Sequence, residues 1–373
     1  MYRYISEDIK NALKAENPTI ILILGLRQTG KTTLAKAVCL EKGYQMFNFD
    51  LLSDRREFER VDRHSLADFA ERYKDKVILI DEVQKMPEAT SIIKHLFDNY
   101  KLRFVLTGSS ELKIRKNFGD TLAGRTKVFH LYPLSIKELL TQERKIKETE
   151  NPSLDLAQIK LQKYLVFGSL PNIENIKPEE YALHLKNFAE TLLSKDVLEI
   201  SGIKKSTKLY GLAKLLAWQV GQLVNVNEVA MLAELSRPTV YSYLDILEQM
   251  NIISRAHAVS INERKAISEK FKVYFTDLGV RNALINNFEN LQTRLDIGAL
   301  LENAVYMGIK RQLDYEHRTY KMGFFRSKTG SEIDIVAQYN GKTYLYEVKT
   351  SDRFQRKKGV VSYITKSNAW KYL

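Results

Sequence analysis

The residues with the clearest chemical potential lie near the start of the chain, in the segment TIILILGLRQTGKTTLAKAV. This segment predicts a buried strand, a turn bounded by Gly25 and Gly30, and a helix with apolar residues at helical spacing. The backbone amides of such a loop, with the positive end of the new helix, surround phosphate. In this P-loop pattern Lys31 would reach the β and γ phosphates, and the Thr32 hydroxyl would ligate magnesium. Thr33 is included among the expected nucleotide contacts.

An acidic pair completes the predicted nucleotide site. Residues 77–80 predict a strand that ends in Asp81 and Glu82. At the carboxyl end of a central parallel strand, Asp81 would hold magnesium through water, and Glu82 would orient the attacking water. A solvated loop start is the alternative, but the P-loop upstream favours catalysis. The pattern therefore predicts an enzyme that hydrolyses ATP with Mg²⁺.

Two further groups downstream are candidates for contact with the γ-phosphate. Thr107 and Ser109 follow the next predicted strand and would bind the γ-phosphate or the lytic water, although TGSS is also ordinary turn chemistry. Arg125 is a candidate arginine finger for a neighbouring subunit's nucleotide, which would require a homo-oligomer. A surface ion pair is the alternative for Arg125, and Arg103 and Arg115 are rival candidates.

The composition indicates what must position these residues. A chain of 373 residues, with 44% hydrophobic residues and few Gly or Pro, is expected to fold into several domains. A single cysteine fits a reducing compartment, and the longest apolar stretch, residues 20–24, is too short for a bilayer. We expect a cytoplasmic protein with no membrane partner. The formal net charge of +13 favours an acidic surface or nucleic acid as partner, with hydrated lysine-rich faces as the alternative.

At this point the chain resembles a family of prokaryotic AAA-type ATPases of largely undefined role. The resemblance covers nearly the whole chain and is carried by GLRQTGKTT, ILIDEVQK, FVLTGSS, LAGR, YPLSIKEL, FGSLP and SKDV, in that order. It implies an ATPase core followed by a winged helix and a domain of the restriction-nuclease-like PD-(D/E)xK type. The expected fold class is α/β. The expected domains are an AAA-like core with a parallel sheet at 1–145, a helical lid at 146–205, a winged helix-turn-helix at 206–285 and a small α/β nuclease-like domain at 286–373.

Residues 208–250 show helix-turn-helix order, with Ser236 as a candidate cap and Pro238 in the first turn of the last helix. The segment 252–275 alternates like a β-wing and is basic; its cations are Arg255, Arg264, Lys265, Lys270 and Lys272.

The predicted recognition helix itself gives mixed evidence on DNA binding. Arg237 is its strong cation, but Asp245 and Glu248 follow the polar start of the helix. We expect DNA as a partner. A lid or protein-binding module is the alternative.

The local pattern near the C-terminus predicts a hairpin at Asn340-Gly341. If these two residues form the loop, Asp334 lies across from Glu347, and Glu332 faces Lys349 on the same side. Opposed carboxylates repel each other unless a cation lies between them, and magnesium is a suitable cation.

The spacing of Asp334 and Glu347-Val-Lys349 resembles the signature of the restriction-endonuclease-like fold, and Glu302 matches the acidic residue that the family places on the preceding helix. The resemblance implies Glu302, Asp334 and Glu347 as metal ligands, with Lys349 beside the scissile phosphate. A solvent-facing hairpin, or a nuclease fold that does not cut, is the alternative.

The sequence thus predicts an ATPase coupled to a DNA-binding domain that cleaves phosphodiester bonds if its metal site is active. A nucleotide-gated regulator with a non-cleaving nuclease-like fold that binds DNA or a protein partner is the second hypothesis. A remodeller that acts on protein is the third.

Overall fold

The computed structural model describes residues 2–61, 65–109, 122, 124–144, 154–197, 206–259, 270–326 and 332–349. The chain divides into two compact units, Met1–Tyr132 and Pro133–Leu373. Its fold class is α/β, as predicted.

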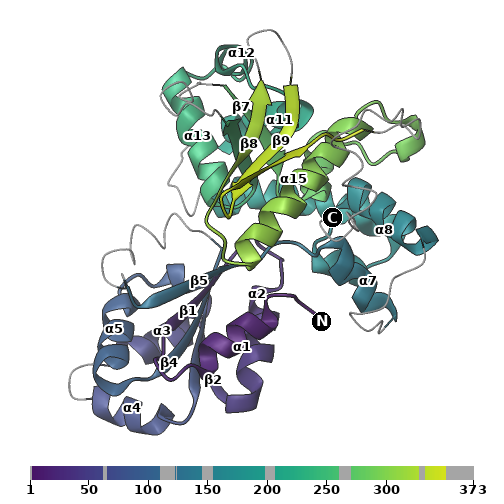
Figure 1. The fold of residues 1–373 in the computed structure, drawn as a ribbon. Coiled ribbons are helices and arrows are strands. Elements are labelled where there is room, and N and C mark those ends of the chain that lie inside the picture. Colours follow the sequence, from purple (N-terminus) through teal and green to yellow (C-terminus); the bar gives the residue numbers. More distant parts are fainter. Residues whose placement is uncertain are drawn as a thin grey trace. The chain divides into compact units, whose positions relative to one another are not determined.

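The first unit is built on a parallel sheet, drawn in purple and blue in Figure 1. Its described strands are β1 (Ile20–Leu24), β2 (Tyr44–Asn48), β3 (Val77–Asp81), β4 (Arg103–Gly108) and β5 (Thr126–His130). They lie in the order β2-β3-β4-β1-β5, and each neighbouring pair is parallel. Every residue of β1 and β3 is buried, because a parallel sheet needs helices on both faces.

The helices of the first unit provide that cover. They are α1 (Ser6–Lys14), α2 (Lys31–Cys39), α3 (Leu52–Glu59), α4 (Leu66–Tyr73) and α5 (Ala89–Tyr100). In Figure 1, α1 and α5 lie on opposite sides of the sheet. Ile78 and Ile80 of β3 share a core with Ile93 and Leu96 of α5. This packing fixes the strand ends from which the candidate site residues project.

The second unit begins with helices that pack on one another. They are α7 (Ile136–Arg144), α8 (Leu154–Phe167) and α9 (Tyr181–Thr191), with α14 (Leu278–Leu284) and α15 (Ile297–Tyr315) from later in the chain. Ser135 and Glu138 form a capping box at the start of α7: the Glu138 amide donates to Ser135 Oγ at 3.0 Å, and the Ser135 amide donates to Glu138 Oε2 at 2.8 Å. Leu139 shares a core with Tyr164 and Leu300.

The predicted helix-turn-helix order is confirmed in the structure. α11 (Ser206–Trp218), α12 (Val226–Leu232) and α13 (Arg237–Gln249) follow one another. Ser236 caps α13, as predicted, by accepting from the Thr239 amide at 3.3 Å, and Asn225 caps α12 by accepting from the Asn227 amide at 3.1 Å.

A second sheet continues directly from these helices. Its described strands are β6 (Ile253–Ala258), β7 (Phe271–Phe275), β8 (Tyr320–Arg326), β9 (Glu332–Tyr339) and β10 (Lys342–Tyr346), in the order β10-β9-β8-β6-β7. β6 pairs with β8 in parallel, whereas the other neighbours are antiparallel. α15 packs against β7.

This division differs from the four predicted domains. The apolar face of α7 packs against α8 and α15 and so joins the second unit, although we expected residues up to 145 in the ATPase core. The expected boundary at 285/286 falls within one sheet, because β6 of the expected wing pairs with β8 of the expected nuclease-like domain. Backbone pairing across that boundary joins the two segments into one body.

The hairpin prediction is confirmed as far as Tyr346. Tyr339 pairs with Lys342 and Ile335 pairs with Tyr346, around Asn340 and Gly341. The strand then ends, so the predicted cross-strand pairs beyond this point do not form as ladder pairs. On the other edge of β9, Glu332 pairs with Arg326 of β8.

Among the described residues, none of the helices has the length and apolar content that crossing a membrane requires.

Candidate functional site

The loop between β1 and α2 has the geometry that the P-loop pattern predicts. Gly30 adopts a left-handed conformation (φ 90°) just before Lys31 begins α2. At Gly25 a Cβ atom would lie 2.1 Å from the carbonyl oxygen of Leu131, so no larger residue fits there. The two glycines therefore set the turn and the close packing of the loop on the chain after β5.

Lys31 lies inside this loop. Its side chain donates to the carbonyl oxygens of Gly25 and Leu26 at 3.0 and 3.1 Å, and only 5% of the residue is exposed. Thr33 is exposed on the first turn of the same helix. The ammonium group thus lies at the amino end of α2, where the helix dipole and the loop amides also favour an anion.

Thr32 and Asp81 meet across the sheet edge. The Thr32 hydroxyl donates to Asp81 Oδ1 at 2.8 Å, and the Thr107 hydroxyl donates to the same oxygen. Thr107 belongs to β4, which lies between β3 and β1 in the sheet, so its side chain comes beside the Asp81 carboxylate at the end of β3. A hydroxyl and a carboxylate from two elements form a pair of hard oxygen donors, the type that magnesium prefers.

Glu82 is held in a second set of contacts. Ser109 Oγ donates to Glu82 Oε2 at 3.2 Å, and the Glu82 amide donates to Thr107 Oγ1 at 3.3 Å. Gln84 also donates to the Glu82 carboxylate and contacts Ser109 Oγ at 3.1 Å. Glu82 has φ 54°, a left-handed conformation that is costly for a residue with a side chain. Gln84 was not predicted from the sequence, and its only signal was its place two residues after Glu82.

Arg125 makes an ion pair within the first unit. Its guanidinium donates to the two carboxylate oxygens of Asp98 at 2.7 and 2.9 Å. The pairing raises the pKa of Arg125 and lowers that of Asp98. The rival Arg103 donates to the carbonyl oxygen of Leu13 at 2.6 Å, and Arg115 lies outside the described residues.

In the second unit, Glu302 lies against cationic and phenolic groups of β7. Lys272 Nζ lies 3.0 Å from Glu302 Oε1 and 2.7 Å from Glu332 Oε1, with its side chain 3% exposed. The Tyr274 hydroxyl donates to Glu302 Oε1 at 2.6 Å. Burial raises the pKa of Glu302, although Lys272 and Tyr274 stabilise its charge. Burial opposes the charge of Lys272, but Glu302 and Glu332 outweigh it, and its pKa is raised.

The other predicted residues of the hairpin have different partners from those expected. Asp334 Oδ2 accepts from the Val348 amide at 2.8 Å. Lys349 Nζ lies 3.2 Å from Glu347, where we expected it opposite Glu332. This correction follows from the end of β10 at Tyr346, since residues 347–349 no longer continue the ladder. Across the described part of the chain, no group of three or more His, Cys, Asp or Glu side chains is arranged to hold a metal ion.

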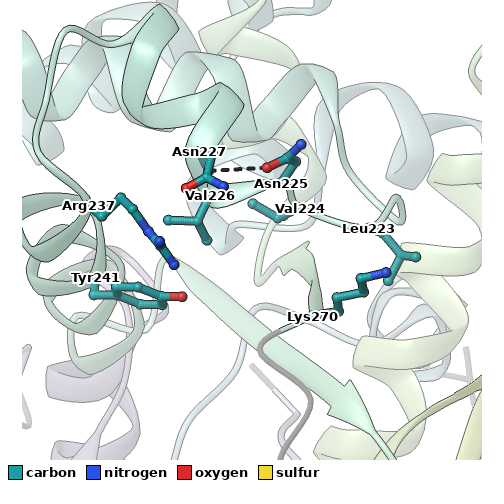
Figure 2. A pocket seen from close by; sticks show the side chains of 8 residues that line it. All are labelled: Leu223, Val224, Asn225, Val226, Asn227, Arg237, Tyr241 and Lys270. Carbon is teal, nitrogen blue, oxygen red and sulfur yellow. Dashed lines mark hydrogen bonds between the residues drawn. The ribbon is translucent and has the colours of Figure 1, made fainter.

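A pocket of about 540 Å³ opens at the helix-turn-helix. It lies between the starts of α12 and α13 and the strand region that begins at Lys270, and Figure 2 shows its lining side chains. These residues are Leu223, Val224, Asn225, Val226, Asn227, Arg237, Tyr241 and Lys270. Two cations, an aromatic phenol and two amides therefore line one concave surface.

The basic residues of the expected wing lie in different surroundings. Arg255 pairs with Glu248 at 2.6 Å and with Asp245 at 2.7 Å, and Lys272 is buried as described. Arg264 and Lys265 lie outside the described residues. The acidic residues that counted against DNA binding are thus both paired with Arg255, which offsets part of their negative charge, whereas Arg237 and Lys270 line the pocket.

Comparison with known protein families gives three matches along the chain. Residues 17–140 match an AAA domain, residues 158–291 match a domain of unknown function (DUF8612), and residues 297–367 match another (DUF4143). The first match spans the loop, the acidic strand end and the sheet described above. The first unit is an AAA-type P-loop ATPase domain.

Other proteins are similar to this chain over most of its length. An uncharacterized protein of Methanocaldococcus jannaschii, MJ1637, is 24% identical and is matched over 96% of this chain and 84% of its own. An uncharacterized protein of Haemophilus influenzae is 24% identical over 86% of this chain and 79% of its own. Among solved structures, the Walker-type ATPase PABY2304 of Pyrococcus abyssi aligns with a TM-score of 0.51 at 14% identity, covering 75% of this chain and 94% of that one.

Proposed function

We propose that this protein is a magnesium-dependent ATPase whose nucleotide state controls a DNA-binding second unit. The observation that carries the proposal is the meeting of Thr32 and Asp81 at 2.8 Å, beside the buried Lys31 of an AAA-type P-loop. The proposal places the protein in the cytoplasm, where ATP, magnesium and DNA occur together.

The residues present fit a magnesium ion. Thr32 and Asp81 supply hard oxygen donors from the first turn of α2 and from the end of β3, and they would hold Mg²⁺ directly or through water. When bound, the ion would neutralise charge on the β and γ phosphates. Lys31 and the loop amides would bind the same phosphates, so the nucleotide would lie at the amino end of α2.

Glu82 is the proposed residue that orients the attacking water. Ser109 and Gln84 hold its carboxylate, and Thr107 holds its backbone amide. Thr107 and Ser109 keep their proposed roles as γ-phosphate sensors, because both contact the acidic pair that would respond to the phosphate. When a γ-phosphate is bound, their hydroxyls would donate to it in place of the carboxylates of Asp81 and Glu82.

Arg125 is the proposed arginine finger of a homo-oligomer. Asp98 now holds its guanidinium, and a neighbouring subunit's γ-phosphate would compete with that carboxylate for the same donors. A slower ATPase in Arg125→Ala, restored by mixing with Lys31→Ala protein, is the expected result. An ATPase rate independent of Arg125 and of protein concentration would contradict the proposal.

The pocket at the helix-turn-helix is the proposed DNA interface. Arg237 and Lys270 supply positive charge, and Tyr241 and the amides supply hydrogen-bond donors, at the start of a helix of winged-helix type. Phosphate contacts of this kind give affinity with little sequence preference. Because Arg255 pairs with both Asp245 and Glu248, it offsets part of the negative charge of α13 that would oppose a phosphate there.

Phosphodiester cleavage by Glu302, Asp334 and Glu347 is the less favoured part of the hypothesis. Lys272 and the Val348 amide already engage the first two carboxylates, and Glu347 pairs with Lys349. We therefore favour a second unit that binds DNA without cutting it. The nuclease hypothesis predicts Mg²⁺-dependent nicking that Asp334→Ala abolishes, whereas the favoured hypothesis predicts no nicking in either protein.

The proposal is tested by measuring ATP hydrolysis with and without duplex DNA, in Mg²⁺ and in EDTA. We expect hydrolysis that requires Mg²⁺, is lost in Lys31→Ala, and changes in rate when DNA is added. Hydrolysis that is unaffected by any DNA would point to a protein partner for the second unit.

A further inference from the structure

The second unit buries a lysine beside Glu302, one of the acidic residues that the sequence predicts as metal ligands. Lys272 projects from β7, where it pairs with Ala256 of β6, so its backbone is fixed by the sheet. Its ammonium lies within 3.0 Å of carboxylate oxygens from both α15 and β9, namely Glu302 and Glu332. It also lies 5.4 Å from the centre of the Phe324 ring on β8.

The neighbouring acceptors are also engaged by groups of this chain. Glu302 Oε1 takes a second hydrogen bond, from Tyr274 at 2.6 Å, and Asp334 Oδ2 accepts from the Val348 amide at 2.8 Å. Arg326 lies 3.7 Å from the other oxygen of Glu332. A magnesium ion takes oxygen ligands at about 2.0–2.1 Å in octahedral geometry. To bind here it would have to displace an ammonium that is already within contact of two carboxylates.

The charges of this junction depend on the ammonium. Without Lys272, Glu302 and Glu332 would remain as two carboxylates in a poorly solvated place, an arrangement that attracts a divalent cation. A vacant metal site would attract that cation in the wild type, whereas a junction held by an ammonium would do so only after the ammonium is removed. The two kinds of site therefore differ in which protein, wild type or Lys272→Met, binds the metal ion.

We infer that Lys272 is the built-in cation of this acidic cluster, taking the place of a metal ion and joining β7, α15 and β9 as a metal-free junction. The inference depends neither on ATP hydrolysis nor on DNA binding. Its consequence is that the C-terminal strands keep the acidic residues of a nuclease-like pattern without their metal chemistry.

The test is Mn²⁺ binding to the full chain without nucleotide, followed by the electron paramagnetic resonance signal of free Mn²⁺. Any weak binding at the P-loop is common to all variants and cancels in the comparison. Wild type and Glu302→Gln are expected to bind the same amount. Lys272→Met frees the carboxylates and is expected to bind one further equivalent, which the double variant Lys272→Met/Glu302→Gln loses. Lys342→Met, which removes an exposed lysine from the same sheet, is the matched control and gains none.

Thermal unfolding in EDTA gives a second measurement that does not require the Lys272 variant to fold. We expect the wild-type melting temperature of the second unit to be the same in Mg²⁺ as in EDTA, because the ammonium of Lys272 occupies the place of a metal ion. A wild-type Mn²⁺ equivalent that Glu302→Gln removes would overturn the inference. So would a folded Lys272→Met that gains no Mn²⁺, or a wild-type second unit that melts at a higher temperature in Mg²⁺ than in EDTA.

Discussion

Lys31 and Glu82 carry separate parts of the proposed ATPase chemistry. Lys31 lies inside the phosphate-binding loop, whereas the carboxylate of Glu82 is directed by Ser109 and Gln84 at the end of β3. The left-handed backbone of Glu82 is a local strain that the surrounding contacts maintain. One residue is therefore expected to govern binding and the other the chemical step.

Substitution of these two residues is expected to separate binding from hydrolysis. Lys31→Ala should lose both ATP binding and hydrolysis, because it removes the cation that contacts the phosphates. Glu82→Gln should bind ATP normally and hydrolyse it slower by a factor on the order of 10²–10³, the cost typical of a lost catalytic group. Fluorescent-nucleotide titration and phosphate release measure the two steps. Normal hydrolysis by Glu82→Gln would show that another residue orients the water.

At the scale of elements, the turn after α8 is locked to the start of α14. Asp277 accepts from the Ser169 amide at 2.8 Å and from the Val280 amide at 3.1 Å, and burial raises its pKa to about 6. Gly168 has φ 70°, and a Cβ there would lie 2.2 Å from Asp277 Oδ1. The FGSLP segment, residues 167–171, therefore has a structural role, because it holds the end of α8 against the start of α14.

Gly168→Ala is expected to destabilise the second unit by about 2 kcal/mol or more, from the left-handed backbone and the contact with Asp277. Gly211 of α11 is the matched control, since a Cβ there meets nothing within 4 Å. Gly211→Ala should be neutral or stabilising by about 0.5–1 kcal/mol. Urea unfolding of the two variants checks this prediction. Equal stability of the two variants would contradict the role of the turn.

Asp296 gives a prediction on pH. Burial opposes its charge, but hydrogen bonds from Arg294 and Arg281 lower its pKa from 3.8 to about 2. The folded protein then binds this proton more weakly than the unfolded chain, so the stabilisation is complete above about pH 5 and is lost as the pH falls toward 2. Its size is about 2 kcal/mol, and about half is lost by pH 3.

Asp296→Asn should therefore be less stable than wild type at pH 6, by a difference that shrinks by about 1 kcal/mol at pH 3. Unfolding free energies at the two pH values measure it. Glu289→Gln, at an exposed position, is the control. A difference between wild type and Asp296→Asn that stays constant with pH would refute the coupling to the arginines.

The elements that local pattern specifies were predicted well from the sequence. The P-loop, the acidic strand end and the Asn340-Gly341 hairpin each depend on a few neighbouring residues with strong conformational preferences. The place of Lys272 could not be predicted in this way, because it depends on β6 pairing with β8. The pairing of Arg255 with Asp245 and Glu248 could not be predicted either, because the sequence of a strand does not indicate which acidic residues its basic side chains will contact.

At the scale of the whole molecule, the net charge of +13 is a weaker guide than the position of individual cations. Some basic residues, such as Lys31 and Lys272, are buried, and others, such as Arg255, pair with carboxylates. Arg237 and Lys270 line the pocket at the helix-turn-helix. A DNA backbone would be recognised by these positions, with an affinity that falls as salt increases.

Arg237→Ala and Lys270→Ala are each expected to weaken duplex binding for all sequences and to reduce the slope of log affinity against log salt by about 1. Lys186→Ala removes the same charge from an exposed position on α9 and should leave the slope unchanged. Fluorescence anisotropy at several salt concentrations measures the slope. Equal effects of all three substitutions would indicate that only the overall charge attracts DNA.

The most direct measurement of the central claim is the steady-state rate of ATP hydrolysis in Mg²⁺, with and without duplex DNA, for wild type, Lys31→Ala and Arg237→Ala. The account predicts hydrolysis by wild type that DNA changes, no hydrolysis by Lys31→Ala, and hydrolysis by Arg237→Ala that no longer responds to DNA at the same concentration. Hydrolysis that persists in Lys31→Ala, or a DNA response that persists fully in Arg237→Ala, would contradict it.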